Sequence, residues 1–330
     1  MIPVFVPMRH AGHAPSLDYS DGLPPFRHLE TASRVDAAQA GVAAALDVET
    51  REVEGAAEDL ARAIHDADYV DFLRDICASL GSGEEYIPAL FGDDLATAAL
   101  PLRGGAFSRE IGTPIGPDTY DAALNALAAA RDAASWSAAH RRHAVALCRP
   151  PGHHAGRRRY GGYCFFNNAY GAARVLAAAG RSATVLDIDY HLGDGSMEFA
   201  TAETPYYSIH LDPSENYPYL PADRGLDVAD VVTTRALQAG CAIGDYLPVL
   251  EEMVGAINAA SPDHLIVSAG FDLLDGDYIQ DQEAAITAAD FERIGAAVRA
   301  FDGPILFLFE GGYHETRLAA AVEAFFRAFR

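Results

Sequence analysis

Lysine is absent from this chain of 330 residues, so all 24 of its basic side chains are arginines. Without a lysine, the protein cannot form a Schiff base with a carbonyl substrate or carry the lysine of a nucleotide-binding phosphate loop. The 47 aspartates and glutamates leave a formal net charge of -23. Because phosphate binding requires clustered cations, this charge argues against nucleic acid as a partner and favours cationic ligands.

Cysteines are few, and long apolar runs are missing. The four cysteines form no C-x-x-C pair, and their spacing suits neither a disulfide scaffold nor a zinc ribbon. We therefore expect free thiols in a reducing compartment. No apolar run approaches the ~18–20 residues that cross a bilayer, and the opening MIPVFVPMRH lacks the layout of a secretory signal. We expect a cytoplasmic protein with no membrane partner.

Short, continuously apolar runs alternate with alanine-rich stretches along the chain. This alternation predicts an α/β protein whose parallel sheet is covered by helices on both faces. In such a fold, functional groups lie on the loops that follow the C-terminal ends of strands. The predicted strands are 3–6, 144–148, 183–188, 206–210, 264–268 and 304–309, and the predicted helices are 57–64, 120–139, 168–179, 243–259, 289–300 and 315–329.

No linker rich in serine, glycine or proline divides the chain. We therefore expect a single domain over residues 1–330. The one long irregular stretch is 81–117, and a connection of this length inside a compact domain usually has a function. We expect it to form an ordered insertion.

Several common catalytic signatures are missing, including G-x-S-x-G, H-E-x-x-H and the phosphate-binding loop. Polar clusters instead follow four of the predicted strands directly. Their sequences are RPPGHHAG, DIDYHLGDG, AGFD and EGGYH, and their chemically active residues are His153, His154, Asp187, Asp189, His191, Asp194, Asp272 and Tyr313.

Asp189 and His191 project to the same side if their segment is extended, because side chains alternate along a strand. With Asp272 they offer one imidazole and two carboxylates. Three protein ligands with an open fourth position are typical of a catalytic zinc, and this donor set also accepts Fe(II), Co(II) or Mn(II). A lone D-x-H is common, and aspartates at strand ends often cap helices. The joint occurrence of all four clusters makes coincidence a poor explanation.

The motifs together resemble the arginase–deacetylase superfamily, on its histone deacetylase-like side, and more specifically the bacterial acetylpolyamine amidohydrolases. The resemblance begins at ETASR (30–34). The stretch EDLARAIHDADYVDFL (58–73) then looks like one helix of the family. The remaining matched motifs follow in the family's order and are RPPGHH, GYCFFNN, DIDYH, SAGFD and EGGY. It implies a single domain around a mostly parallel sheet of about eight strands. It also implies a hydrolase that releases acetate and a free amine.

The resemblance implies a role for each motif residue. Asp189, His191 and Asp272 match the zinc ligands, and Tyr313 matches the tyrosine that donates a hydrogen bond to the oxyanion. His153 and His154 match the general base and acid, and Asp187 and Asp194 match the carboxylates that hold the two imidazoles. The matching potassium site comprises Asp187 and Ser208 with the backbone carbonyls of Asp189, His191 and Ile209. The matching tunnel wall comprises Gly152, Gly162 and Tyr163, faced by Tyr217 or Tyr219.

Three departures from the family pattern affect the surroundings of the site. Leu192 stands where the family usually has a second histidine, and Tyr278 stands where a proline usually follows Asp277. The segment after Tyr219 is shorter than in typical relatives. None of these changes removes a matched ligand or catalytic residue.

The resemblance favours an N-acetylated polyamine or diamine as substrate. Tyr163 in the tunnel and Ile279, seven residues beyond Asp272, both match the polyamine enzymes. Residues 81–117 resemble the insertion with which those enzymes form a homodimer and narrow the tunnel. The insertion carries acids suited to a polycation, namely Glu84, Glu85, Asp93, Asp94 and Glu110, of which Glu110 is the candidate ammonium partner. Alternatively, these acids form only a solvated surface.

The sequence leaves alternative functions to consider. One is an acyl-lysine deacylase of the same family. Another is a binding module that has lost catalysis, although no expected ligand is damaged and Tyr313 is present. A manganese ureohydrolase would need more aspartate and histidine ligands for a second metal, and the RPPGHH histidines and the EGGY tyrosine argue against it.

Overall fold

The computed structural model describes residues 1–19, 24–220 and 227–330, and its centre is an eight-stranded sheet whose strands all run parallel. The strand order is β4-β1-β5-β10-β9-β6-β7-β8. The predicted α/β class and the size of the sheet are confirmed. The strand bounds are β1 Ile2–Pro7, β4 Val48–Val53, β5 Ala144–Ala146, β6 Ala183–Asp187, β7 Tyr206–Leu211, β8 Val232–Leu237, β9 His264–Ala269 and β10 Ile305–Phe309.

The central strands are apolar throughout because both of their faces are buried. In β10, Ile305, Phe307 and Phe309 pack on one side of the sheet. Leu306 and Leu308 pack on the other side. This double burial explains why all six predicted strands lie in the sheet. The sequence analysis missed β4 and β8, the two edge strands, because several of their side chains are polar and exposed.

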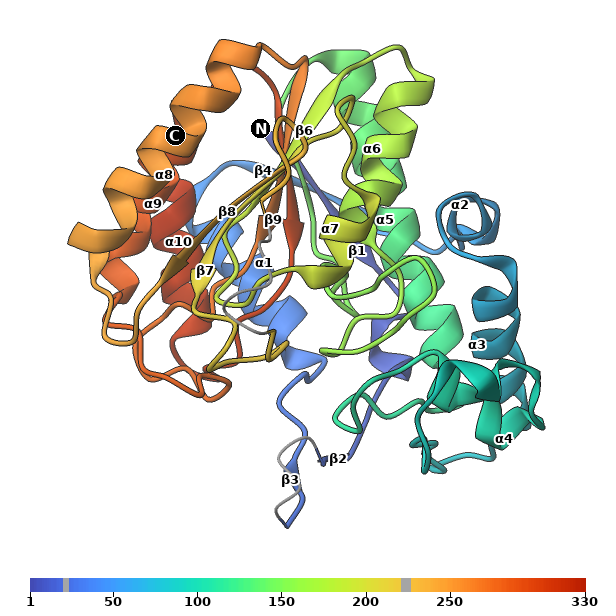
Figure 1. The fold of residues 1–330 in the computed structure, drawn as a ribbon. Coiled ribbons are helices and arrows are strands. Elements are labelled where there is room, and N and C mark those ends of the chain that lie inside the picture. Colours follow the sequence, from blue (N-terminus) through green and yellow to red (C-terminus); the bar gives the residue numbers. More distant parts are fainter. Residues whose placement is uncertain (20–23, 221–226) are drawn as a thin grey trace.

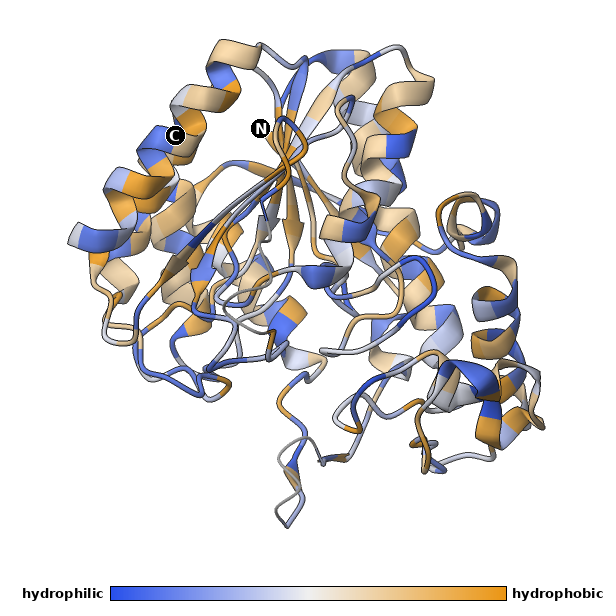
Figure 2. Ribbon diagram, in the orientation of Figure 1, coloured by the Kyte–Doolittle hydropathy of each residue, from blue (hydrophilic) through white to orange (hydrophobic). Residues whose placement is uncertain are grey.

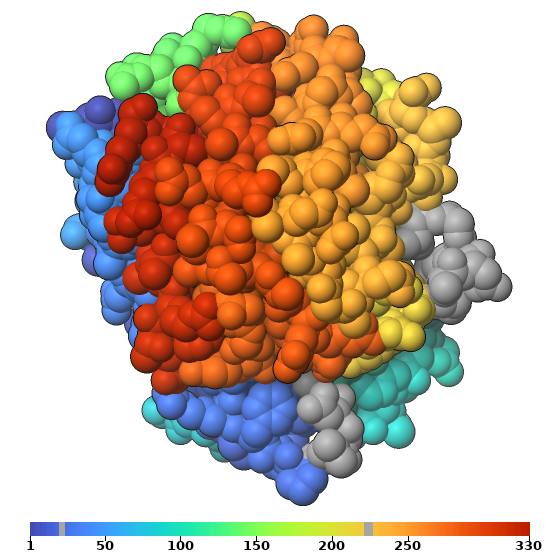
Figure 3. Space-filling model, turned by 90° about the vertical axis from the view of Figure 1, so that its left-hand side faces the viewer, coloured from blue at the N-terminus to red at the C-terminus, as the bar shows by residue number. Residues whose placement is uncertain are grey.

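Helices cover both faces of the sheet (Figure 1). One face carries α1 (Ser33–Ala45), α8 (Ile243–Ala260), α9 (Phe291–Arg299) and α10 (Leu318–Arg327). Figure 3 looks onto this side, where α8 to α10 form a continuous orange-to-red surface. The other face carries α5 (Thr119–His140) and α6 (Asn168–Ala178), with α7 (Asp194–Phe199) close to them. Hydrophobic residues concentrate in the strands and on the helix faces turned towards them (Figure 2).

The stretch 58–73, which resembled one family helix, is two helices. It divides into α2 (Glu58–Ile64) and α3 (Ala67–Ser79). The break falls at His65 and Asp66, whose backbones are extended. The buried His65 ring explains the break, because its Nδ1 lies 2.9 Å from the Gly156 carbonyl and its Nε2 accepts the Asn167 N–H at 3.0 Å. The break thus ties these helices to the loop after β5.

Residues 81–117 are ordered and contain the short helix α4 (Leu100–Arg103) between two 3-10 turns. Tyr86 and Ile115 form a two-way backbone bridge, with N–H to carbonyl distances of 2.8 and 3.0 Å. Phe107 packs against Phe72 of α3, with ring centroids 5.0 Å apart. The bridge therefore closes the insertion on itself near its two ends, and Phe107 packs it against α3.

A two-stranded antiparallel ribbon, β2 (Leu17–Asp18) with β3 (Phe26–Arg27), projects at the lower end of the view in Figure 1. Across the described residues, no helix combines the length and apolar character needed to cross a membrane.

Candidate active site

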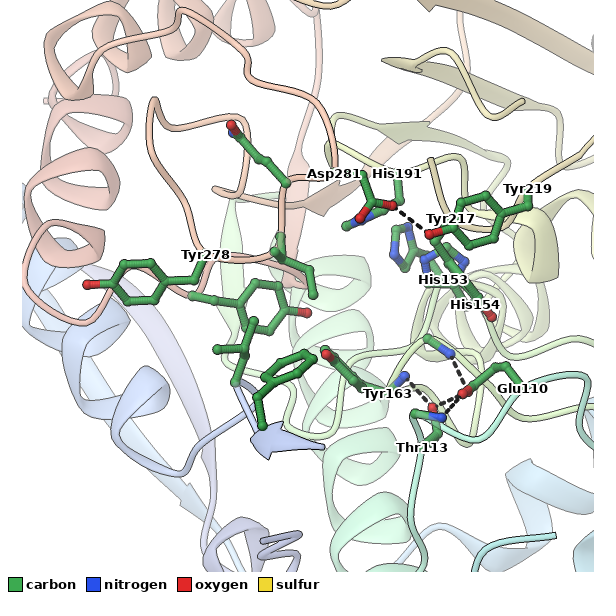
Figure 4. Close-up of a pocket in the computed structure, with 17 residues that line it drawn as sticks. Glu110, Thr113, His153, His154, Tyr163, His191, Tyr217, Tyr219, Tyr278 and Asp281 are labelled. Carbon is green, nitrogen blue, oxygen red and sulfur yellow. Dashed lines mark hydrogen bonds between the residues drawn. The ribbon is translucent and has the colours of Figure 1, made fainter. Parts of the chain in front are cut away.

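Loops at the C-terminal ends of β5, β6, β9 and β10 meet at a cavity of about 260 Å³. Its floor carries His153, His154, His191 and Tyr313. Figure 4 shows the three histidines gathered on one side and Tyr163 with Glu110 on another. The structure therefore brings together floor residues that are up to 160 positions apart in the sequence, from His153 to Tyr313.

Asp189 and His191 follow β6, and Asp272 follows β9, which lies beside β6 in the sheet. The candidate ligand atoms of these three buried residues all lie within 4.8 Å of one another. His191 Nδ1 is 3.1 Å from Asp189 Oδ1 and 3.2 Å from Asp272 Oδ2. The three matched zinc ligands are therefore adjacent.

The cluster fits a divalent cation. Within the described part of the chain, Asp272 Oδ2 is buried and accepts no hydrogen bond. Two buried carboxylates side by side are unfavourable unless a positive charge compensates them. A Cβ atom on Gly311 would clash with Asp272 Oδ2 and Asp189 Oδ2, so a glycine there leaves the space beside these oxygens open. One imidazole and two carboxylates suit zinc, iron, cobalt or manganese.

His153 and His154 are buried side by side, with ring centroids 4.0 Å apart. His153 Nδ1 lies 3.1 Å from Asp187 Oδ2, and His154 Nδ1 lies 2.8 Å from Asp194 Oδ1. Each imidazole therefore lies beside one of the two carboxylates that the family resemblance matched to the pair. Such partners fix the tautomer and orientation of a histidine ring.

The pKa values of the two imidazoles are shifted in opposite directions. Burial and the neighbouring His153 lower the pKa of His154 to about 3. Burial also acts to lower the pKa of His153, but the charges of Asp189 and Asp187 outweigh it and raise that pKa well above its usual value. A pair of titratable groups pushed apart in this way is typical of acid–base sites.

Glu310 supports the histidine loop, a role that the sequence analysis missed. Its carboxylate accepts the backbone N–H groups of Gly152 at 2.7 Å and His153 at 3.2 Å, and the Ser268 hydroxyl at 3.0 Å. Burial raises the pKa of Glu310 to about 7. Its position directly after β10, in the same EGGY motif as Tyr313, was the sequence feature that could have indicated a role in the site.

Tyr313 is held from behind by charged groups. The Arg34 guanidinium lies 4.3 Å from the centre of its ring and donates to the Gly312 carbonyl at 2.6 Å. Arg34 also pairs with the buried Glu30 at 2.7 Å, and Glu30 pairs with Arg149 at 2.9 Å. Burial raises the pKa of Tyr313 well above its usual value, so its phenol stays protonated and can donate a hydrogen bond.

Gly162, Tyr163 and Tyr217 form the wall of the cavity. Gly162 has a φ of 53°, and a Cβ atom there would clash with the His154 ring, so glycine is required on both counts. Tyr163 packs edge-on against Tyr313, with centroids 5.7 Å apart, and its hydroxyl donates to Asp18. Tyr217 packs edge-on against His154 at 4.7 Å. Of the two candidate facing tyrosines, Tyr217 is thus the inner one.

The prediction that Gly152 lies in the tunnel wall is wrong. Gly152 is not among the residues that line the cavity. It is buried where a Cβ atom would come 2.6 Å from the Asn168 backbone nitrogen and 2.9 Å from the Phe166 carbonyl oxygen. Its glycine is therefore required by the close approach of two backbones behind the wall.

Loops form the mouth of the cavity. Tyr219 is 56% exposed, and its hydroxyl donates to Asp281 at 2.7 Å. Ile279 lines the cavity as expected, beside Gln280 and Asp281. Asp281 went unpredicted because its place depends on the path of the loop after β9. Part of the shortened segment after Tyr219 lies outside the described residues.

Tyr278 and Leu192, two of the departures from the family pattern, leave the core of the site intact. The Tyr278 ring stacks on His314 with centroids 4.9 Å apart and points away from the histidines in Figure 4. Its neighbour Asp277 accepts the backbone N–H groups of Tyr313 at 2.8 Å and His314 at 3.0 Å. Leu192 is fully buried in the hydrophobic core.

Of the five acids in the insertion, Glu110 alone lines the cavity. It accepts the Thr113 hydroxyl at 2.5 Å and the Gly162 N–H at 3.2 Å, which joins the insertion to the wall. The remaining acids, Glu84, Glu85, Asp93 and Asp94, lie away from this cavity.

The residues matched to a potassium site are also adjacent. Asp187 on β6 pairs in register with Ser208 on β7, and Ile209 follows. Asp187 Oδ1 accepts the Asp189 N–H at 3.1 Å, and its Oδ2 accepts the Tyr206 hydroxyl at 2.8 Å.

Comparison with known proteins agrees with this geometry. Residues 28–329 match the histone deacetylase domain model. The chain belongs to this family. It is 32% identical to acetylpolyamine amidohydrolase of Mycoplana ramosa over 76% of this chain and 77% of that protein. It is also 32% identical to acetylpolyamine amidohydrolase of Burkholderia pseudomallei over 81% of each.

A solved structure supports the same assignment. The crystal structure of acetylpolyamine aminohydrolase from Burkholderia pseudomallei superposes with a TM-score of 0.92 at 27% identity. The match covers 100% of this chain and 98% of that one. The family and these relatives make the chain a hydrolase that acts on amide bonds.

Proposed function

We propose that this hydrolase removes acetyl groups from small N-acetylated polyamines or diamines and releases acetate and a free amine. The observation that carries the proposal is the Asp189, His191 and Asp272 cluster beside paired histidines and Tyr313, at the floor of a tyrosine-walled cavity. Relatives named acetylpolyamine amidohydrolase, similar over about three quarters or more of their length, support the choice of substrate.

Asp189, His191 and Asp272 would hold zinc, with Fe(II), Co(II) or Mn(II) as substitutes. A bound metal would polarise the amide carbonyl and lower the pKa of a water molecule. The imidazoles of His153 and His154 take the proton from the attacking water and return one to the leaving amine. Asp187 and Asp194 keep the Nδ1 side of each ring occupied, so that Nε2 serves the reaction.

Tyr313 donates a hydrogen bond to the oxygen that becomes negatively charged when the amide is attacked. Its neutral phenol suits this role, since burial keeps its pKa high. Arg34 and the backbone contact to Asp277 hold the tyrosine in place before the substrate arrives. A donor positioned in advance can contribute a large share of the rate.

The mouth of the cavity favours a substrate with a distal ammonium group. Asp281 and Tyr219 lie at the mouth, and the wall adds the Glu110 carboxylate and the Tyr163 and Tyr217 rings. Carboxylates attract a cation, and aromatic faces also bind one. The net charge of -23 draws cations towards the protein as a whole. An acyl-lysine in a peptide is the competing substrate.

Metal removal and replacement test this proposal. The protein is treated with a chelator, dialysed, and reloaded with zinc, and acetate release from N-acetylputrescine is measured at each stage. We expect activity to fall on chelation and to return with about one zinc per chain. Acetate release that is unaffected by complete metal removal would contradict the proposal.

We also propose that the chain forms a homodimer through residues 81–117 in the cytoplasm and binds potassium at Asp187 and Ser208. Exposed apolar side chains on the insertion, Leu90, Phe91 and Leu102, support the dimer. Four buried free thiols support a reducing compartment. Sedimentation of the wild type and of a variant with Leu90→Asp and Phe91→Asp tests the dimer, which the double substitution should dissociate.

A further inference from the structure

Three consecutive arginines follow the histidine loop, and one of them, Arg159, pairs with the carboxylate that holds an active-site histidine. Arg157 donates through Nε to the Glu198 carbonyl at 3.0 Å. Arg158 pairs with Asp68 at 2.7 Å on the surface. Arg159 turns inwards, and its two terminal nitrogens lie 2.7 Å from Asp194 Oδ2 and 2.7 Å from Glu198 Oε1.

Asp194 therefore has a partner on each oxygen. Its Oδ1 lies 2.8 Å from His154 Nδ1, and its Oδ2 accepts a hydrogen bond from Arg159. All three side chains are largely buried, with exposures of 3% for His154, 9% for Asp194 and 14% for Arg159. The three residues form a continuous chain of contacts that runs from the partly exposed Arg159–Glu198 pair to the floor of the cavity.

The second partner matters because a carboxylate with one partner can rotate. The terminal torsion of aspartate has a broad energy profile. Charge-assisted hydrogen bonds from opposite sides remove that freedom, since rotation would weaken both. A fixed Oδ1 keeps the proton of His154 on Nδ1 and leaves the Nε2 lone pair facing the substrate.

Arg159 also ties this carboxylate to the helix that carries it. Asp194 and Glu198 lie one turn apart on α7, and Arg159 binds both. The loop from His154 to Arg159 and the start of α7 are thus held together at the point where Asp194 faces His154.

We propose that Arg159 is a positioning residue that acts through Asp194 to hold His154 in its working tautomer and orientation. Arg159 does not line the active-site cavity, and its side-chain ion pairs are with Asp194 and Glu198, so we expect its effect to reach the reaction through the Asp194 carboxylate. This inference rests on the proposed role of the histidine pair.

Steady-state kinetics of Arg159→Gln with N-acetylputrescine, at full zinc loading, test the proposal. Removing the outer partner of a catalytic group typically costs 10–100-fold in activity, so we expect kcat to fall by roughly that factor with KM nearly unchanged. Arg159→Lys, which keeps the charge but not the two-pronged contact, should retain an intermediate kcat. Arg158→Gln is the matched control, and its kcat should stay within about twofold of the wild type because Asp68 is a surface partner.

A double-mutant cycle separates positioning from simple structural support. If Arg159 acts through Asp194, Arg159→Gln should add little to Asp194→Asn, and the double variant should resemble Asp194→Asn alone. Multiplicative losses in the double variant would overturn the proposal. So would an Arg159→Gln enzyme as active as the Arg158→Gln control.

Two further outcomes distinguish failure of this inference from misfolding and from failure of the proposed function. If Arg159→Gln does not fold, the same cycle is run with Arg159→Lys, and a kcat equal to wild type or multiplicative losses would overturn the proposal. If His154→Ala and Asp194→Asn both keep wild-type turnover, the proposed role of the histidine pair fails first. If they are impaired while Arg159→Gln is not, only this inference fails.

Discussion

The floor and the mouth of the cavity are built differently. On the floor, Asp189 and Asp272 are fully buried at the ends of neighbouring strands, and their positions follow from the sheet. At the mouth, Tyr219 and Asp281 lie on loops, exposed to solvent, and contact each other through a single hydrogen bond. The contrast assigns the chemistry to the sheet and the choice of substrate to the loops. Substitutions on the floor should therefore reduce kcat, and substitutions at the mouth should mainly change KM.

The largest effect is expected on the floor at Asp189. Asp189→Ala removes one of three metal ligands, so we expect both bound zinc and turnover to be lost. Elemental analysis and acetate release, measured on the same preparation, check this. An Asp189→Ala protein with full zinc occupancy would show that the metal is held elsewhere.

Tyr313→Phe should have the next largest effect. It removes one hydrogen-bond donor to the developing oxyanion and leaves the metal ligands intact. We expect kcat to fall by roughly 10²–10³ while zinc content stays unchanged. Turnover close to that of the wild type would mean that Tyr313 does not contact the reacting oxygen.

Gly162→Ala, which lies in the wall between the floor and the mouth, should have a smaller effect on kcat. The positive φ of Gly162 disfavours any side chain, and the new Cβ atom would press on the His154 ring. We expect reduced kcat and a lower melting temperature, because the strain acts in the folded state. Gly180→Ala, also at positive φ but with nothing within 4 Å, is the matched control for backbone strain alone. Equal kcat in the two variants would argue against contact with His154.

The smallest effect is expected at the mouth. Asp281→Asn at the mouth and Glu110→Gln in the adjoining wall each remove one lining carboxylate that can face a distal ammonium. Partly exposed ion pairs contribute about 0.2–1 kcal/mol, so we expect KM for N-acetylputrescine to rise by a few-fold with kcat unchanged. The rise should shrink as salt screens the charges. Equal KM values for the wild type and both variants at low salt would show that these carboxylates do not contribute to substrate binding.

The same contrast explains which features the sequence could predict. The floor residues follow continuously apolar strands, so both their strand-end positions and their meeting point were predictable. The edge strands β4 and β8 lack that pattern because water reaches them. Asp281 escaped prediction because no local pattern fixes the course of its loop. Gly152 was misplaced because the family resemblance does not distinguish a glycine required by backbone packing from one required by a cavity.

The sequence analysis missed the helix break at His65 and the supporting contacts of Glu310 and Arg159 for a different reason. Each depends on a side chain meeting a partner at least 35 residues away, such as Arg159 with Asp194 or Glu310 with Gly152. The residue types were visible in the sequence, but their partners were not. Pairings of this kind emerge only when the loops are placed in three dimensions.

The most direct measurement of the central claim compares kcat/KM of the zinc-loaded wild-type protein for N-acetylputrescine and for an acetyl-lysine peptide, in parallel and at two salt concentrations. The acidic and aromatic lining of the cavity predicts a higher kcat/KM for the acetylated diamine, with a margin that narrows as salt rises. Faster hydrolysis of the peptide at low salt would contradict the assignment and identify the protein as an acyl-lysine deacylase.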